Sequence, residues 1–174
     1  MKDSTDTSPA AGVDLLRGLV VGIDHVAIAV EDLDASIRWY ADNFGFTLVE
    51  KRRTEGKTTA MLSAVMAAGG AVVVLVQGTT PESQVSRFIE HFGPGVQHVA
   101  FEVSDLKAAV ERLAKRQGAA ADTGMIHGKG ISQVFLRRDP GSGVRVELIE
   151  KRGGTFSDAT VGQLFEEFES RDLY

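Results

Sequence analysis

The chain has 174 residues and a formal net charge of -5, which suits one globular domain with a substantial core. Cysteine is absent, which excludes disulfides, thiolate metal sites and cysteine nucleophiles, so a metal would need imidazole and oxygen ligands. Interspersed charges argue against nucleic-acid binding, and the lack of a long apolar run or signal-peptide pattern argues against a membrane protein, so we expect a cytoplasmic one.

Apolar spacing changes repeatedly along the chain between a helical and an alternating pattern, which predicts short elements. Residues 1–17 show no periodicity and are expected to form a flexible arm. Gly45 and Gly118 are placed to end helices, and DPGSG at 139–143 to form a hairpin turn. The expected elements are strand 22–30, helix 33–44, strands 46–52, 58–65 and 71–77, helix 83–91, strand 96–103, helix 106–116, and strands 119–122, 131–136 and 144–150.

The two sets of elements are copies of each other. Placing His98 over His25 also superimposes Ala100 on Ala27 and Asp105 on Asp32. This internal duplication predicts two βαβββ modules, about 22–80 and 95–150, whose sheets pack into one open barrel within a domain spanning 18–150. The two histidines would then lie near its centre, and a homodimer is a fair expectation for a short chain of this architecture.

A third candidate metal ligand follows from the same symmetry. Glu147 has apolar neighbours in GVRVELIEKR, and the equivalent position in the first module is Val74. A lone strand histidine is more often a core residue than a ligand. Two equivalent histidines and one carboxylate, however, form the set that holds a divalent metal and leaves positions open for a chelating substrate and dioxygen. His91 and His127 lack such support and are expected to be solvated.

Over residues 22–150 the motifs resemble the vicinal oxygen chelate superfamily, which includes glyoxalases and extradiol dioxygenases. The resemblance is carried by IDHVAIAVEDLDASIRWYADNFGF, HVAFEVSDL and VELIEK. It implies an α+β fold and a metal held by His25, His98 and Glu147. Two families compete within the superfamily. HGK at 127–129 and FLRRDPGSGVRVELIE are similar to methylmalonyl-CoA epimerase, although strand 58–65 offers no acid as a second base.

The catalytic domain of 4-hydroxyphenylpyruvate dioxygenase is similar over more of the chain. SQVSRFIEHFGPGVQH resembles its segment before the second metal histidine, SQVFL its next pocket strand, and GGTFSDATVGQLFEEFES its closing loop and helix. Gln97 would point away from the metal unless its strand is bulged. Val161 stands where that family has a second stacking phenylalanine. The resemblance implies that the substrate is contacted by Gln84, Gln97, Gln133, Phe135, Phe156 and Val161.

The resemblance therefore implies an Fe(II) dioxygenase that binds an α-keto acid and O2, decarboxylates the acid oxidatively and hydroxylates the same substrate. Co(II), Mn(II) or Zn(II) are the alternative metals. Residues 151–174 would form a loop and a lid helix, with Leu164, Phe165 and Phe168 on its apolar face. Two other functions stay open: a metal-dependent epimerase or lyase of the methylmalonyl-CoA epimerase or glyoxalase type, and a non-catalytic small-molecule binding protein that confers resistance.

Overall fold

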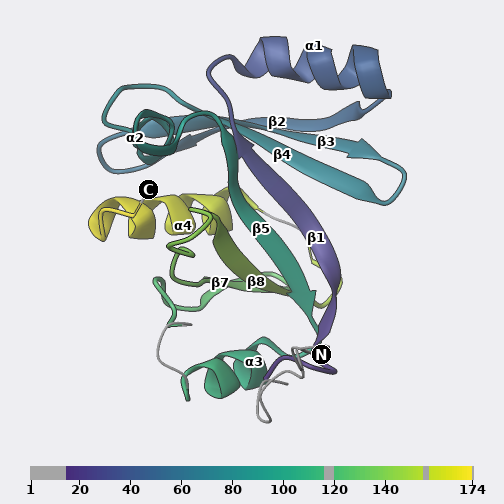
Figure 1. Ribbon diagram of the computed structural model, residues 1–174, viewed down its shortest axis with the longest axis vertical. Helices are drawn as coiled ribbons and strands as arrows, with labels where there is room; N and C mark the ends of the chain where they lie inside the picture. The colour runs from purple at the N-terminus through teal and green to yellow at the C-terminus, as the bar shows by residue number, and fades with distance from the viewer. Residues whose placement is uncertain (1–14, 116–119, 155–156, 174) are drawn as a thin grey trace, which may run out of the picture.

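The computed structural model describes residues 15–115, 120–154 and 157–173. Within them, eight strands form one curled mixed sheet in the order β2-β3-β4-β1-β5-β8-β7-β6 (Figure 1). The elements in chain order are β1 Val20–Ala29, α1 Leu33–Phe44, β2 Thr47–Glu55, β3 Ala60–Ala68, β4 Ala71–Gly78, α2 Gln84–Phe92, β5 Gly95–Val103, α3 Leu106–Leu113, β6 Ile126–Gly128, β7 Ile131–Phe135, β8 Arg145–Lys151 and α4 Asp158–Ser170.

The sheet consists of two equivalent modules that meet at its centre. β1 pairs in parallel with β4, β5 pairs in parallel with β8, and β1 and β5 run antiparallel to each other. Ala27 lies opposite Val74 in the first module, and Ala100 lies opposite Glu147 in the second. These are the positions that the duplication in the sequence matches. The expected α+β fold of two modules in one open barrel is confirmed.

The helices that follow β1 and β5 begin in the same way. Asp32 and Asp105 each cap a helix by accepting a hydrogen bond from the backbone N–H three residues later, at 2.9 and 2.8 Å. α1 ends at Gly45, which has a left-handed φ of 70°, as its sequence predicts. Gly118, expected to end the equivalent helix, lies outside the described residues.

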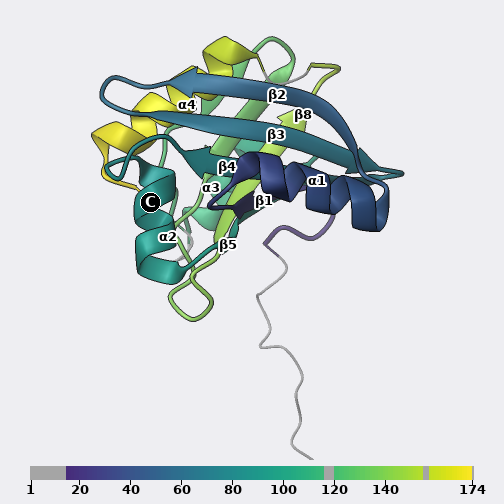
Figure 2. The same ribbon diagram turned by 90° about the horizontal axis from the view of Figure 1, so that it is seen from above.

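Helices cover both faces of the sheet, with α4 inside the curl. Figure 1 shows α1 and α3 outside the two halves of the sheet and α4 between them. Figure 2 shows α1 along the outer surface of the first half. Leu15 and Leu16 pack against the apolar cluster beneath α3, so packed structure begins inside the segment expected to be an arm. Among the described helices, none is long and apolar enough to cross a membrane.

The second module departs from expectation between α3 and β7. Of the strand expected at 119–122, the described residues 120–122 form one bridge, from Ala121 to Leu136. The backbone N–H groups of Asp122 and Thr123 both donate to the Phe135 carbonyl, at 2.8 and 3.3 Å, so the chain turns away instead of continuing a ladder. The short strand β6 forms after this turn. The hairpin turn expected at 139–143 is present, closed by a bond from Gly143 N to Asp139 O at 2.9 Å.

Candidate metal centre

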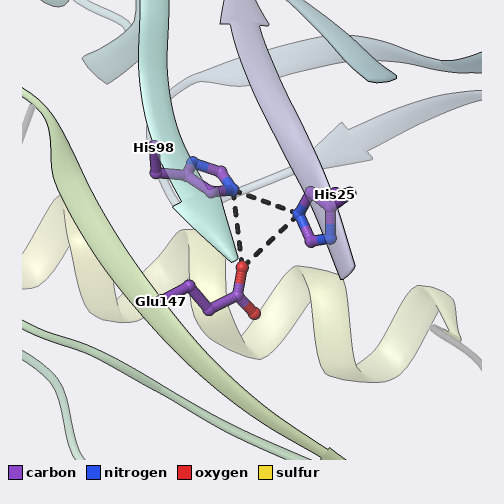
Figure 3. Close-up of side chains that lie close together, drawn as sticks. All are labelled: His25, His98 and Glu147. Atoms are coloured by element: carbon purple, nitrogen blue, oxygen red, sulfur yellow. Dashed lines mark hydrogen bonds and ion pairs between the residues drawn. The ribbon is translucent and has the colours of Figure 1, made fainter. Parts of the chain in front are cut away.

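Three strands of the curled sheet bring His25, His98 and Glu147 together (Figure 3). The Nε2 atoms of His25 and His98 lie 3.3 Å apart. Glu147 Oε2 lies 3.5 Å from His25 Nε2 and 3.4 Å from His98 Nε2. Since the candidate ligands come from β1, β5 and β8, two modules are needed to assemble the site.

A β-bulge before each histidine turns its ring toward the site. The register of β1 and β5 shifts at two points near the histidines, which leaves Asp24 and Gln97 as the extra residues. Asp24 Oδ1 lies 2.8 Å from His25 Nδ1, and Gln97 Oε1 contacts His98 Nδ1. An oxygen acceptor at Nδ1 favours the tautomer whose Nε2 lone pair is available to a metal. Strict alternation would point Gln97 away from the metal site. Because of the bulge, Gln97 instead contacts and orients the candidate ligand His98.

The first bulge residue is charged and is held by a lysine. Burial disfavours ionised Asp24, but hydrogen bonds from His25 and Lys151 outweigh it and hold the pKa of Asp24 below its usual value. Burial also disfavours protonated His25, yet its bond to Asp24 and the charge of Glu147 raise its pKa. The Asp24–Lys151 pair therefore places a nearly balanced charge pair behind His25.

Burial disfavours the charged forms of the other two candidate ligands when no cation is present. Burial raises the pKa of Glu147 to about 7, although His25 opposes this. Burial, together with His25 and Arg145, holds the pKa of His98 well below its usual value. Oε1 of Glu147 is buried and has no hydrogen-bond partner within the described part of the chain. A buried carboxylate with an unsatisfied oxygen is the kind of group that a bound cation stabilises.

The geometry of the three donors fits a divalent metal. Bonds of about 2.1 Å to one cation place neighbouring ligand atoms about 3.0 to 3.4 Å apart, depending on coordination number, and the three observed separations are 3.3 to 3.5 Å. Two imidazoles and one carboxylate suit Fe(II), Co(II), Mn(II) and Zn(II) alike. The donor set therefore supports a metal site without choosing among these ions.

Asp24→Asn is expected to weaken metal binding by about tenfold to a hundredfold, because the carboxylate that orients His25 and raises its basicity is replaced by an amide that can turn its NH2 toward the ring. Titration of the protein with Co(II), followed by its visible absorbance, measures this. Asp42→Asn, on the exposed side of α1, is the matched control and should leave the affinity unchanged. Equal affinities for the two variants would show that Asp24 does not support the ligand.

The candidate ligands open onto a cavity of about 110 Å3 between the sheet and α4. A neighbouring hollow of about 60 Å3 extends toward α2 and shares several of the same walls. The first is lined, besides the candidate ligands, by Glu50, Arg52, Met61, Ser63, Val65, Val74, Val76, Gln133, Phe135, Val161 and Leu164. The position equivalent to Glu147, Val74, thus lies in the wall of the cavity and offers no donor atom.

Most of the expected substrate residues lie around these hollows. Gln133, Phe135 and Val161 line the cavity at the candidate ligands, whereas Gln84 and Gln97 line the hollow toward α2. Both amide atoms of Gln133 are buried with no hydrogen-bond partner among the residues described. The remaining expected residue, Phe156, lies outside the described residues.

Four polar residues near the candidate ligands were missed by sequence reasoning. Glu50 and Arg52 lie two residues apart on β2 and both line the cavity. This spacing is present in the sequence, but both residues belong there to the mixed-charge run EKRRTEGK. Asp24 would require knowledge of the bulge. Arg145 is two residues before Glu147 and therefore on the same face of β8. It is buried, with its Nη2 atom 3.4 Å from Asp122 Oδ2 and its guanidinium carbon 5.2 Å from the ring centroid of Phe168.

Carboxylates near the C-terminal end of α4 hold this helix across the cavity. Glu169 accepts from the backbone of the loop between β2 and β3, Glu167 accepts from Gly124 N at 2.7 Å, and Asp172 pairs with Arg87 of α2. The bonds to Glu169 come from Lys57 N at 2.7 Å and Thr59 N at 2.9 Å. α4 is therefore fixed to both modules by polar contacts as well as by its apolar face.

Acidification should release the contact of α4 with the β2–β3 loop. Burial disfavours ionised Glu169, but hydrogen bonds from Thr59 and Lys57 outweigh it and lower its pKa from 4.5. The contact thus contributes stability above about pH 4.5 and loses it as the pH falls through the lowered pKa. Glu169→Gln should remove this dependence and, at neutral pH, speed hydrogen exchange at the amides of Lys57 and Thr59. Glu90→Gln, an exposed change on α2, should do neither; equal exchange in both variants would contradict the expectation.

The chain is similar to known proteins over most of its length. Residues 22–148 match the model of the Glyoxalase/Bleomycin resistance protein/Dioxygenase superfamily. The 4-hydroxyphenylpyruvate dioxygenase of Hordeum vulgare is 33% identical over 102 residues, which are 53% of this chain and 24% of that enzyme. The methylmalonyl-CoA epimerase structure from Mycobacterium tuberculosis is 34% identical, with a TM-score of 0.63 over 76% of this chain and 89% of that one.

A mutant of 4-hydroxymandelate synthase from Streptomyces coelicolor has the same fold, with a TM-score of 0.75 and 24% identity over 86% of this chain and 54% of that chain. This chain thus spans about half of the synthase and about a quarter of the barley enzyme. The duplicated modules, the site at their junction and the match over residues 22–148 lead to one conclusion. The chain belongs to the Glyoxalase/Bleomycin resistance protein/Dioxygenase superfamily.

Proposed function

We propose that the protein is a mononuclear non-haem Fe(II) dioxygenase that acts on an α-keto acid. In the proposed reaction the acid loses its carboxyl group as CO2. One oxygen atom of O2 enters the new carboxylate and the other enters a hydroxyl group on the same substrate. The observation that carries the proposal is the position of the three candidate ligands at the end of a covered cavity, with the unpartnered amide of Gln133 in its wall.

The residues of the cavity suit each part of this proposal. Fe(II) held by the three ligands would supply the sites at which an α-keto carboxylate chelates and O2 is reduced. The Gln133 amide can donate to a substrate oxygen without adding charge. Phe135, whose ring centroid lies 5.0 Å from that of His98, forms an apolar wall beside the reacting atoms. Val161 and Leu164 of α4 close the opposite side and exclude water.

The relatives support the proposal in different ways. The barley dioxygenase is 33% identical to this chain over 102 residues, which supports a dioxygenase among the family's activities. The hydroxymandelate synthase supports only the fold, because its identity is 24%. The activity itself therefore rests on the cavity and its candidate ligands.

Anaerobic loading with Fe(II), followed by exposure to O2 with a panel of α-keto acids, tests the proposal. We expect O2 consumption that depends on one member of the panel and yields CO2 in equal amount. His98→Ala should abolish both, because it removes a ligand. Binding of keto acids to the loaded protein without any O2 consumption would overturn the oxygenase proposal.

A metal-dependent epimerase is the second candidate, and two observations favour it. The methylmalonyl-CoA epimerase structure is 34% identical and is nearly covered by this chain. Strand 58–65 has no acid, but Glu50 on β2 lines the cavity and could take a proton from a carbon next to a metal-bound carbonyl. This candidate predicts Co(II)-dependent exchange of that proton with deuterated water in the absence of O2, and loss of the exchange in Glu50→Gln.

A further inference from the structure

The first module contributes one wall of the cavity, and this wall carries an ion pair. The ion pair includes neither the candidate ligands nor Gln133. Glu50 and Arg52 lie two residues apart on β2, so their side chains leave the same face of the strand, and both line the cavity. The Arg52 guanidinium contacts the Glu50 carboxylate. Apart from Ser63, the neighbouring cavity residues on β3 and β4 are apolar: Met61, Val65, Val74 and Val76.

The two partners of this ion pair differ in their access to water. The side chain of Arg52 is 14% exposed, whereas that of Glu50 is 43% exposed. Glu50 can therefore turn to solvent at little cost, because an exposed ion pair contributes little stability. Arg52 has no such freedom. Its guanidinium stays charged at any ordinary pH, and because the side chain is mostly buried, an anion beside it is favourable.

We infer that Arg52 binds a second carboxylate of the substrate, at the end away from the metal, and that this carboxylate displaces Glu50. The inference rests on the proposed function, because it assumes that the α-keto carboxylate end is held at the metal. A planar guanidinium matches a carboxylate with two parallel hydrogen bonds. The substrate class is then an α-keto acid with two carboxylates.

The size and charge of the cavity agree with such a substrate. A volume of about 110 Å3 is small beside the roughly 300 to 1,000 Å3 of most ligand pockets, which favours a compact acid. Val161 supplies a small aliphatic wall, so an aromatic ring would be stacked on one side only. The divalent metal and Glu147 together carry one positive charge and Arg52 carries another. A dianion would neutralise both.

A matched pair of ligands tests the inference by binding alone. α-Ketoglutarate and α-ketovalerate have the same chain length, but the first ends in a carboxylate and the second in a methyl group; α-ketoadipate and α-ketocaproate form a longer pair. Binding to the Co(II)-loaded protein is followed without O2 by the change in visible absorbance. In at least one pair we expect the dianion to bind about tenfold to a hundredfold more tightly, the range for a hydrogen-bonded charge pair.

Two variants assign this preference to Arg52. Arg52→Met keeps the length of the side chain and should abolish the preference, while Co(II) affinity and α-ketovalerate binding stay unchanged. Glu50→Gln should strengthen dianion binding several-fold, because it removes the competing carboxylate. Unchanged far-ultraviolet circular dichroism and melting temperature in Arg52→Met exclude misfolding as the cause.

The outcomes separate this inference from the proposed function. Equal binding of both members of both pairs by the native protein, or a preference that survives in Arg52→Met, overturns the role of Arg52. A preference that depends on Arg52 without O2 consumption on Fe(II) loading supports the distal contact and overturns the oxygenase reaction. Failure of every keto acid to perturb the Co(II) spectrum overturns both.

Discussion

Glu147→Gln is expected to lower the affinity for a divalent metal by more than about a hundredfold while leaving the metal-free fold intact. The amide has nearly the same shape as the carboxylate but lacks its charge, and loss of a ligand exceeds the effect of losing a residue that merely orients one. Titration with Co(II) measures the affinity. Glu102→Gln, on β5 outside the cavity, is the control. Binding by Glu147→Gln within about tenfold of the native protein would contradict the assignment.

The same substitution should change how the stability of the metal-free protein depends on pH. In the folded chain the pKa of Glu147 is raised from 4.5 to about 7. Between these values the folded state keeps a proton that the unfolded chain has released, so stability falls as the pH rises through this window, by on the order of 3 kcal/mol in total. Urea unfolding at several pH values should show this decline in the native protein and its absence in Glu147→Gln.

Metal loading should cancel that loss of stability. The cation replaces the proton on Glu147, so the folded and the unfolded chain both carry the ionised carboxyl group between pH 4.5 and about 7, and its contribution no longer changes with pH. Parallel unfolding series with Co(II) and with a chelator compare the two slopes. A decline in the Co(II)-loaded protein as steep as in the metal-free protein would show that Glu147 is not a ligand.

Phe165→Ala is expected to release α4 from the barrel. Phe165 is 1% exposed and lines the hollow between α4 and α2, so its truncation should cost about 3 kcal/mol or more. Phe165 lies in the contact between α4 and the rest of the molecule, so the loss of stability should be confined to α4. Amides of α4 should exchange about a hundredfold faster, while those of β1 and β5 change little. Hydrogen exchange followed by mass spectrometry resolves the two regions.

The release of α4 should also affect the proposed reaction. Without α4 the substrate would be held less firmly in the cavity, so O2 consumption should exceed the amount of hydroxylated product. Phe44→Ala, which truncates a phenylalanine that is 56% exposed on α1, is the control. Tight coupling of O2 to product in Phe165→Ala would show that α4 does not protect the site.

The sequence alone was sufficient for the features that repeat. His25 and His98 could be paired because the two modules share the residues around them, and Glu147 stood out because its strand is otherwise apolar. The structure brings these three side chains together as expected, and the α+β fold follows from the same duplication. Their role as ligands remains a prediction that the metal titrations test.

The features that could not be predicted arise from local backbone geometry and from distant contacts. Strict alternation would point Asp24 and Gln97 away from the histidines, but a bulge at each brings them to the Nδ1 atoms. Residues 120–122 of the strand expected at 119–122 form a single bridge, after which two backbone amides converge on the Phe135 carbonyl. Glu50 and Arg52 looked like surface charges, because their face of β2 becomes the cavity wall only when α4 covers it.

Among the candidate ligand positions, the approximate two-fold symmetry of the barrel is broken at one pair, Val74 and Glu147. Two identical, separate modules would have to supply either two carboxylates at their junction or none. Two would cancel the charge of a divalent ion and remove its attraction for an anionic reactant, whereas none would leave the ion weakly held. Covalent linkage of the halves in one chain permits the intermediate case. A single carboxylate then holds the divalent ion, and one of the ion's two positive charges stays available to attract an anionic reactant.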